Sequence, residues 1–275
     1  HALGVRGHRL TEVIFKKAFR DPLVLSTFVR DITGVDVTFR AEDIETEKSF
    51  YPKVGQINFR YDIYAEDSEH RIVVEIQKVD YDHNFDRFLH YHLQAITEQQ
   101  RKSEDYTVQK RVYSIIVITA PYKMKGKNGE IVRDEVLISK LDPRNLAGQE
   151  REIYRHELYF LNPLYRDGNV PAQYRDWLDL IYESICHPEK PDINYMHPGI
   201  KRASELADQV NLSPEEWEAS KIVAARLKVL EIEHQSGMEE GFVKGKAEGK
   251  AEGKAEGKAE GKAEGLAEGE AKGEV

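Results

Sequence analysis

Cysteine is almost absent from this chain of 275 residues, in which Cys186 is the single one. One cysteine excludes an internal disulfide framework and a cluster of thiolates around a metal ion. The sequence also lacks apolar runs of the roughly 18 to 20 residues that cross a bilayer, and a leader with a basic start and an apolar core. We therefore expect a soluble protein that has no membrane partner and works in the reducing environment of the cytoplasm.

An excess of positive charge is lacking too, since 40 Lys and Arg face 49 Asp and Glu and the formal net charge is −9. Such a chain has no overall attraction for polyanions, so any contact with nucleic acid must come from a local basic patch. Hydrophobic residues make up 40% of the chain and charged residues 32%, which allows a core and leaves a well solvated remainder. With roughly 100 to 200 residues per domain, we expect one main domain with attached segments.

Glycine is unevenly spread, with ten of the 19 glycines at every fourth position from Gly237 to Gly273. No strand pattern precedes them, and residues 1–234 hold no glycine-rich phosphate loop, which excludes a dinucleotide-binding fold. In a helix this repeat would align like charges, and each glycine would cost about 1 kcal/mol relative to alanine. We therefore expect residues 236–275 to be mostly disordered. The alternative is a glycine stripe that lets two helices approach, so that the C-terminal helix and the tail form a homo-oligomer.

The hydrophobic pattern predicts a helix, a group of strands with a helix between them, and then more helices. Steps of three and four predict helices over residues 11–31 and 85–100, and Pro22 marks a break or a first helical position in the former. Alternation with a period of two over residues 56–64 and 72–77 predicts a β-hairpin. The continuous β-branched run over residues 112–119 predicts a strand that is covered on both faces.

The rest of the chain predicts one more strand and then helices. We expect a strand over residues 131–138, helices over residues 150–161 and 172–185, and a last helix that begins at the N-cap Ser213 and ends near His234. This organisation is an α/β core over residues 8–145, a helical region over residues 146–235 and the repeat tail over residues 236–275.

Acidic residues of the hairpin are the first candidates for chemistry. If Ser68 and Glu69 form the turn, Asp62 lies directly opposite Glu75, and two facing carboxylates repel each other. A divalent cation between them would remove the repulsion, and Mg²⁺ is usually held by one or two carboxylates together with water and phosphate. Gln77 points to the same side of the hairpin. The same pattern also fits an amphipathic hairpin whose solvent-facing side carries acids.

The order of a helix, Asp62, the sequence Glu75-Ile76-Gln77 and a further helix resembles the PD-(D/E)XK nuclease superfamily. More narrowly, it is similar to the recombination-promoting nuclease (Rpn) and transposase family, in which Gln stands where most of the superfamily has Lys. Residues 12–19, 87–91, 104–118 and 212–216 and the glycine repeat agree with that family. The resemblance implies a restriction-endonuclease-like mixed sheet flanked by helices, with a helical C-terminal region and a Gly-Lys-Ala-Glu repeat tail.

The resemblance also implies roles for individual residues. Asp62 and Glu75 match the metal-binding acids, and Gln77 matches the third catalytic position. Glu12, on the first helix, stands where an additional metal ligand is expected, and Arg87 would lie near the scissile phosphate. The candidates for contact with nucleic acid are Lys16, Lys17, Arg20 and Tyr91.

The function implied is a DNA endonuclease that hydrolyses phosphodiester bonds with Mg²⁺, or with Mn²⁺ in its place, in recombination, transposition or genome defence. Because Gln77 carries no positive charge, the cation that stabilises the transition state must come from another residue, either Arg87 or Lys16. Two alternatives stay open. The chain could be a catalytically inactive binding or assembly protein with the nuclease fold, or a transposase that performs strand transfer with the same metal site.

Overall fold

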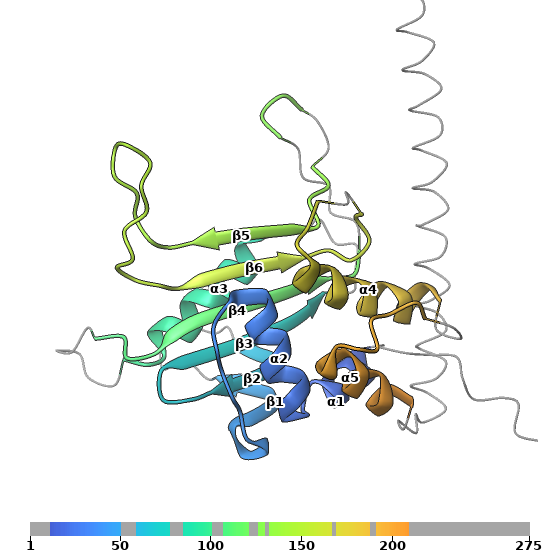
Figure 1. Cartoon of the computed structure of the whole chain (residues 1–275). Coiled ribbons are helices and arrows are strands. Elements are labelled where there is room, and N and C mark those ends of the chain that lie inside the picture. The colour runs from blue at the N-terminus through green and yellow to red at the C-terminus, as the bar shows by residue number, and fades with distance from the viewer. Residues whose placement is uncertain are drawn as a thin grey trace, which may run out of the picture. The chain divides into compact units, whose positions relative to one another are not determined.

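A six-stranded mixed sheet with helices on both faces forms the centre of the structure (Figure 1). This computed structural model describes residues 12–50, 59–77, 85–100, 107–120, 126–129, 132–166, 169–187 and 191–208. The strand order is β1-β2-β3-β4-β6-β5. The chain therefore has the α/β fold, a mixed sheet flanked by helices, that the sequence predicts.

The sheet combines an antiparallel half with a parallel centre. Strands β1 (Ile44–Phe50), β2 (Phe59–Glu66) and β3 (His70–Gln77) are antiparallel neighbours. Strands β4 (Arg111–Ile118) and β6 (Glu157–Leu161) continue the sheet parallel to β3, and β5 (Val136–Lys140) closes it antiparallel to β6. Because β3 and β4 are parallel, the chain must cross over between them, and helix α3 (Phe85–Thr97) lies in this crossover.

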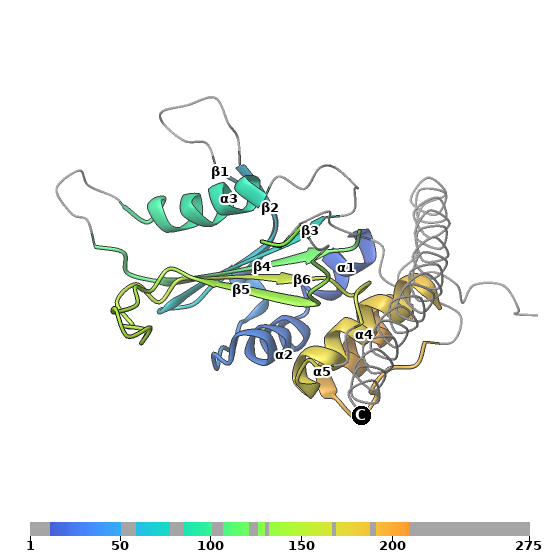
Figure 2. The same ribbon diagram turned by 90° about the horizontal axis from the view of Figure 1, so that it is seen from above.

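Helices α1 (Glu12–Ala18), α2 (Pro22–Thr33), α4 (Ala172–Cys186) and α5 (Pro198–Asp208) lie on one face of the sheet, and α3 lies on the other (Figure 2). The main core fills the space between the four helices and the sheet. Its centre is aromatic, since Trp177 packs edge-on against Phe28, and Phe28 packs edge-on against Phe19. Two smaller apolar clusters pack beneath α3. No helix in these described ranges is long and apolar enough to cross a membrane.

The first predicted helix divides into α1 and α2 at the position that the sequence marks. The Asp21 carboxylate caps α2 by accepting hydrogen bonds from the backbone N–H groups of Leu23 and Val24, and Pro22 begins the helix. Gly34 ends α2 in the left-handed conformation, with φ of 74°. The prediction of a break or a first helical position at Pro22 is confirmed.

The helix expected over residues 150–161 is wrong, because Glu157–Leu161 form strand β6 between β4 and β5. The apolar run of four residues, Leu158 to Leu161, fits either a helix or a strand, and pairing with two neighbouring strands decides the outcome. The sheet therefore extends past residue 145, where the sequence placed the end of the core. Strand β1 and helix α5 were not expected. The predicted helix from Ser213 to His234 and the repeat tail lie outside the described residues.

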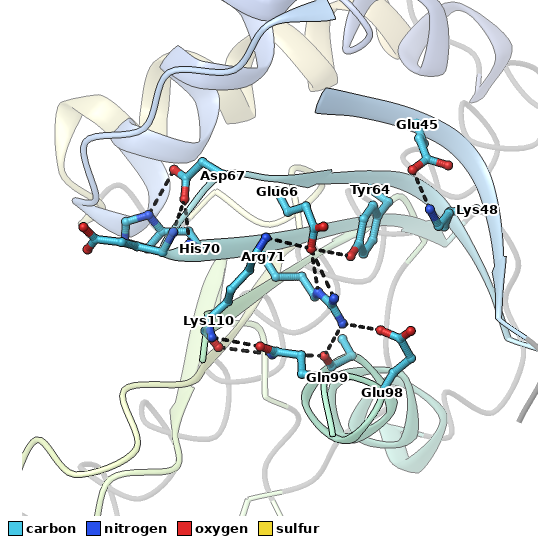
Figure 3. Close-up of polar contacts among 12 residues, drawn as sticks. Glu45, Lys48, Tyr64, Glu66, Asp67, His70, Arg71, Glu98, Gln99 and Lys110 are labelled. Atoms are coloured by element: carbon cyan, nitrogen blue, oxygen red, sulfur yellow. Dashed lines mark hydrogen bonds and ion pairs between the residues drawn. The ribbon is translucent and has the colours of Figure 1, made fainter. Parts of the chain in front are cut away.

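Arg71 fixes α3 against the hairpin of β2 and β3 (Figure 3). Its guanidinium donates hydrogen bonds to the Glu66 carboxylate, to the Glu98 carboxylate at 2.7 Å and to the Ala95 carbonyl at 2.9 Å. Arg71 is buried, and bonds from a planar guanidinium to several fixed acceptors restrict the orientation of the helix. This attachment at the end of α3 fixes the direction in which the helix passes over the sheet.

Candidate active site

The hairpin has the predicted register. Ile63 pairs with Val74, and Glu66 pairs with Arg71, so that Ser68 and Glu69 form the turn. The Asp67 carboxylate stabilises this turn by accepting hydrogen bonds from the backbone N–H groups of Glu69 and His70, at 2.8 and 2.7 Å (Figure 3). Asp62 and Glu75 are the next opposed pair in this register.

Regular backbone pairing between β2 and β3 ends at Ile63 and Val74, and side chains take over from there. The backbone N–H of Asp62 donates to Glu75 Oε1 at 3.1 Å, and the backbone N–H of Ile76 donates to Asp62 Oδ2 at 2.9 Å. Each carboxylate thus accepts a bond from the backbone of the opposite strand. These two bonds bring the two acids together where the strands separate.

The alternation of β2 changes at Asp62. Strict alternation would place Tyr61 on the same face as Ile63, which belongs to the main core. Instead, Tyr61 packs with Tyr64 in the cluster beneath α3, and its hydroxyl donates to the Tyr91 carbonyl at 2.9 Å. The local change of direction lets the Asp62 side chain reach Lys16 on α1, which lies on the face of the sheet opposite to α3.

Lys16 extends from α1 into the site. Its Nζ lies 2.7 Å from Asp62 Oδ1 and 2.7 Å from Glu47 Oε1. Only 14% of the Lys16 side chain is exposed, so its ammonium group is largely enclosed by the protein. It offsets the charge of two carboxylates in a partly desolvated position.

Glu47 is a site residue that the sequence analysis missed. The register of β1 and β2 places it directly opposite Asp62, so Glu47, Asp62 and Glu75 form a row across three adjacent strands. Its φ is 60°, which is unusual for a residue with a side chain and is often found at functional sites. The sequence could have indicated Glu47 only if β1 had been recognised as a strand. The polar sequence of β1 gives no strand pattern.

Glu75 lies in a buried and electrostatically unfavourable position. Its side chain is buried, with 5% exposed. Burial raises the pKa of Glu75 well above its usual value, and repulsion from Asp62 raises it further, against opposing effects of Arg87 and Lys16. A carboxyl group in such surroundings gains stability from an added proton or from a nearby cation.

Helix α3 brings Arg87 and Tyr91 to the side of the sheet on which Glu75 lies. The Arg87 guanidinium donates to the Tyr91 hydroxyl at 3.0 Å and lies over the Tyr91 ring. Arg87 is exposed, and it is close enough to Glu75 to lower the pKa of that carboxyl. An exposed guanidinium beside a buried carboxyl group is suited to bind a phosphate oxygen.

The structure gives a position for the other predicted site residues, on β3 and in or just after α1. The carbonyl of Gln77, two residues beyond Glu75, accepts bonds from the N–H and hydroxyl of Thr119 on the adjoining chain segment. Lys17 and Arg20 are exposed near the end of α1. Glu12 begins α1, and its side chain lies outside the described part of the structure.

A divalent cation fits the pair of Asp62 and Glu75 chemically. The described ranges contain no group of three or more His, Cys, Asp or Glu side chains arranged to hold a metal ion. Two carboxylates are nevertheless a usual protein contribution to a Mg²⁺ site, where water and phosphate supply the other ligands. Burial and the neighbouring Asp62 raise the pKa of Glu75, so a cation near this carboxyl would offset its charge, and Lys16 already pairs with Asp62.

Comparison with models of known protein families gives a match. A family model described as "PD-(D/E)XK nuclease family transposase" matches residues 42–231, which is more than half of the chain. The matched range includes all six strands and α3, whereas α1 and Lys16 precede it. No curated protein and no solved structure matches the chain.

Proposed function

The chain belongs to the PD-(D/E)XK nuclease family transposases, and on this basis we propose that it is a metal-dependent endonuclease that cleaves DNA in the cytoplasm. The nuclease-type function follows from the family. The choice of DNA, Mg²⁺ or Mn²⁺ as the ion, and a role in recombination, transposition or genome defence are our proposal.

The observation that carries the proposal is the pairing of Asp62 with Glu75. Each carboxylate accepts a backbone bond from the opposite strand, and the pKa of Glu75 is raised by burial and by Asp62. A cation bound there would be stabilised by both acids. A bound Mg²⁺ ion lowers the pKa of its water ligand and offsets the charge that grows on a phosphate.

The chain's own groups have defined tasks in this proposal. Asp62 and Glu75 would hold the metal, and Gln77 would orient a water molecule or a phosphate oxygen. Arg87, supported by Tyr91, would bind the phosphate. Lys17 and Arg20 would bind the nucleic-acid backbone, which gives affinity that depends on salt and little on sequence.

A second candidate function is a binding or assembly protein that keeps the nuclease fold without cleavage. Two observations favour it: Lys16 Nζ already contacts Asp62 Oδ1, and Gln77 carries no charge. If Lys16 stays in that position, the metal loses one of its ligand oxygens. Cleavage activity separates the two candidates.

The test is cleavage of supercoiled plasmid DNA with Mg²⁺, Mn²⁺ or EDTA by the parent, Asp62→Asn and Glu75→Gln proteins. Glu45→Gln is the matched control, because Glu45 lies on β1 and pairs with Lys48 outside the site (Figure 3). We expect metal-dependent nicking that both site variants lose and the control keeps. A pure parent protein that leaves the plasmid intact with either metal would support the binding function instead.

A further inference from the structure

We propose that Lys16 supplies the catalytic positive charge that Gln77 cannot provide, and that Glu47 positions Lys16 for this task. The inference rests on the proposed nuclease function and identifies one of its catalytic residues. It assigns a role to α1, which lies outside the part of the chain that the family model matches.

The need for a cation follows from the chemistry of phosphodiester hydrolysis, in which negative charge grows on the phosphate oxygens. Gln77 stands where most of the superfamily has Lys, and a carboxamide has no charge. Arg87 is exposed and bonded to the Tyr91 hydroxyl on its own helix. Lys16 differs from Arg87, because its ammonium group directly contacts Asp62, one of the two acids proposed to bind the metal.

The geometry allows Lys16 to exchange partners. Its ammonium group lies 2.7 Å from a carboxylate oxygen on each of two neighbouring strands, Asp62 Oδ1 on β2 and Glu47 Oε1 on β1. A lysine has a flexible four-carbon stem and three donors. If a metal ion takes Asp62 Oδ1, the ammonium group can remain bonded to Glu47 and turn toward a phosphate bound beside the metal.

Glu47 is suited to hold Lys16 in this way. It lies in the same cross-strand row as Asp62 and Glu75, and Arg60 forms an ion pair with its second oxygen. Its positive φ of 60° is a backbone strain that the sheet maintains, and such strain is found where function requires a particular orientation. Glu47 would therefore remain the partner of Lys16 throughout the reaction.

This arrangement makes opposite predictions for cleavage and for metal affinity. Lys16→Met removes the catalytic charge, so cleavage at saturating Mg²⁺ should slow by on the order of 100-fold. The same change removes a cation that competes for Asp62, so Mn²⁺ should bind several-fold more tightly to the protein without DNA. A lysine that only stabilised the fold would, on removal, weaken both properties together.

The experiment measures plasmid cleavage and Mn²⁺ binding, the latter by electron paramagnetic resonance, for the parent and for variants of the full chain. Lys16→Arg should recover part of the lost rate. Gln77→Lys in the Lys16→Met background should raise the cleavage rate by about tenfold or more, because it returns a lysine to the superfamily position. Lys48→Met is the matched control on β1, since Lys48 pairs with Glu45, and it should change neither property.

Glu47 is tested through its coupling to Lys16. Glu47→Gln should lower kcat by about tenfold with little change in KM, as expected of a group that positions the catalytic charge. In the Lys16→Met background the same substitution should have no further effect, because the two residues act as one unit. Additive losses would overturn the positioning role of Glu47.

The outcomes separate this inference from the proposed function. If the parent cleaves DNA and Lys16→Met cleaves it equally fast, or if the variant loses both cleavage and Mn²⁺ affinity without rescue by Gln77→Lys, the inference is overturned and the nuclease function stands. If the parent cleaves no DNA with either metal, the nuclease function is overturned, and the catalytic role of Lys16 with it.

Discussion

The carboxylate of Glu75 is expected to lower the stability of the folded protein, although the proposed function requires it. Because its pKa is raised in the folded protein, the unfolded chain releases its proton more readily. In the metal-free protein, stability therefore falls as the pH rises from about 4.5, the usual value for Glu, toward the folded-state pKa. Glu75→Gln should raise Tm at pH 7 and remove this pH dependence, while it abolishes cleavage. Calorimetry of both metal-free proteins from about pH 4 to pH 8 tests it, and an unchanged Tm would contradict it.

Because of the buried His92, we expect a contribution to stability that changes with pH in the opposite direction. Its ring is fully buried, with Nδ1 2.8 Å from Ser114 Oγ, and Nε2 has no hydrogen-bond partner among the described residues. Burial lowers the pKa of His92 to about 4 from 6.5, and His156 contributes to the shift. The unfolded chain therefore binds more protons in this range, so stability falls as the pH drops below about 6.5.

Between about pH 7 and pH 5 this effect should remove about 2 kcal/mol of the free energy of unfolding. Denaturant titrations of the parent and His92→Leu proteins at the two pH values measure it. The variant should show a smaller decrease, because it lacks the titrating group. Equal decreases in the two proteins would mean that His92 is protonated as easily in the fold as in water.

At the scale of elements, an ion pair between the buried Glu135 and the partly buried Arg175 joins α4 to the start of β5. Glu135 is fully buried, and both of its oxygens accept bonds from the Arg175 guanidinium, at 2.9 and 2.5 Å. Arg175→Met leaves a buried carboxylate without its partner and should cost about 3 to 5 kcal/mol. The double variant Glu135→Leu with Arg175→Met should recover most of this loss. Urea unfolding midpoints give the comparison, and a single variant as stable as the parent would contradict it.

The same scale shows what the sequence could predict. Alternation and a short turn were enough for the hairpin, its register and the opposition of Asp62 and Glu75, because these depend on local geometry. Lys16 and Glu47 could not be assigned to each other, since their contact requires the packing of α1 and the pairing of β1, whose polar sequence gives no strand pattern. The helix predicted over residues 150–161 was wrong for a related reason. Pairing with β4 and β5 makes Glu157–Leu161 a strand, and the local sequence alone does not contain that information.

At the scale of the whole molecule, α5 packs against α1 and α2, which lie more than 150 residues earlier in the sequence. A Cβ at Gly199 would lie 2.0 Å from Thr27 Oγ1 and 3.1 Å from the Trp177 ring. Thr27 cannot easily move, because its hydroxyl is bonded to the Leu23 carbonyl at 2.6 Å. Gly199→Ala should therefore cost about 1 to 3 kcal/mol through overpacking. Thermal unfolding tests this prediction, with Lys201→Ala, an exposed substitution on the same helix, as the control. Equal Tm values for the Gly199→Ala and parent proteins would contradict it.

The contacts of Asp31 also bear on how the protein is made. Its carboxylate is bonded to Trp177 on α4 and to His197 just before α5, residues that a ribosome adds long after α2. Until those helices emerge, the apolar surfaces of α1 and α2 that pack against α4 and α5 stay uncovered, and nascent chains with such exposed surfaces are bound by chaperones. The helix that carries Lys16 thus gains its final support late in translation. We expect ribosome-bound chains that stop before α4 to leave DNA uncut.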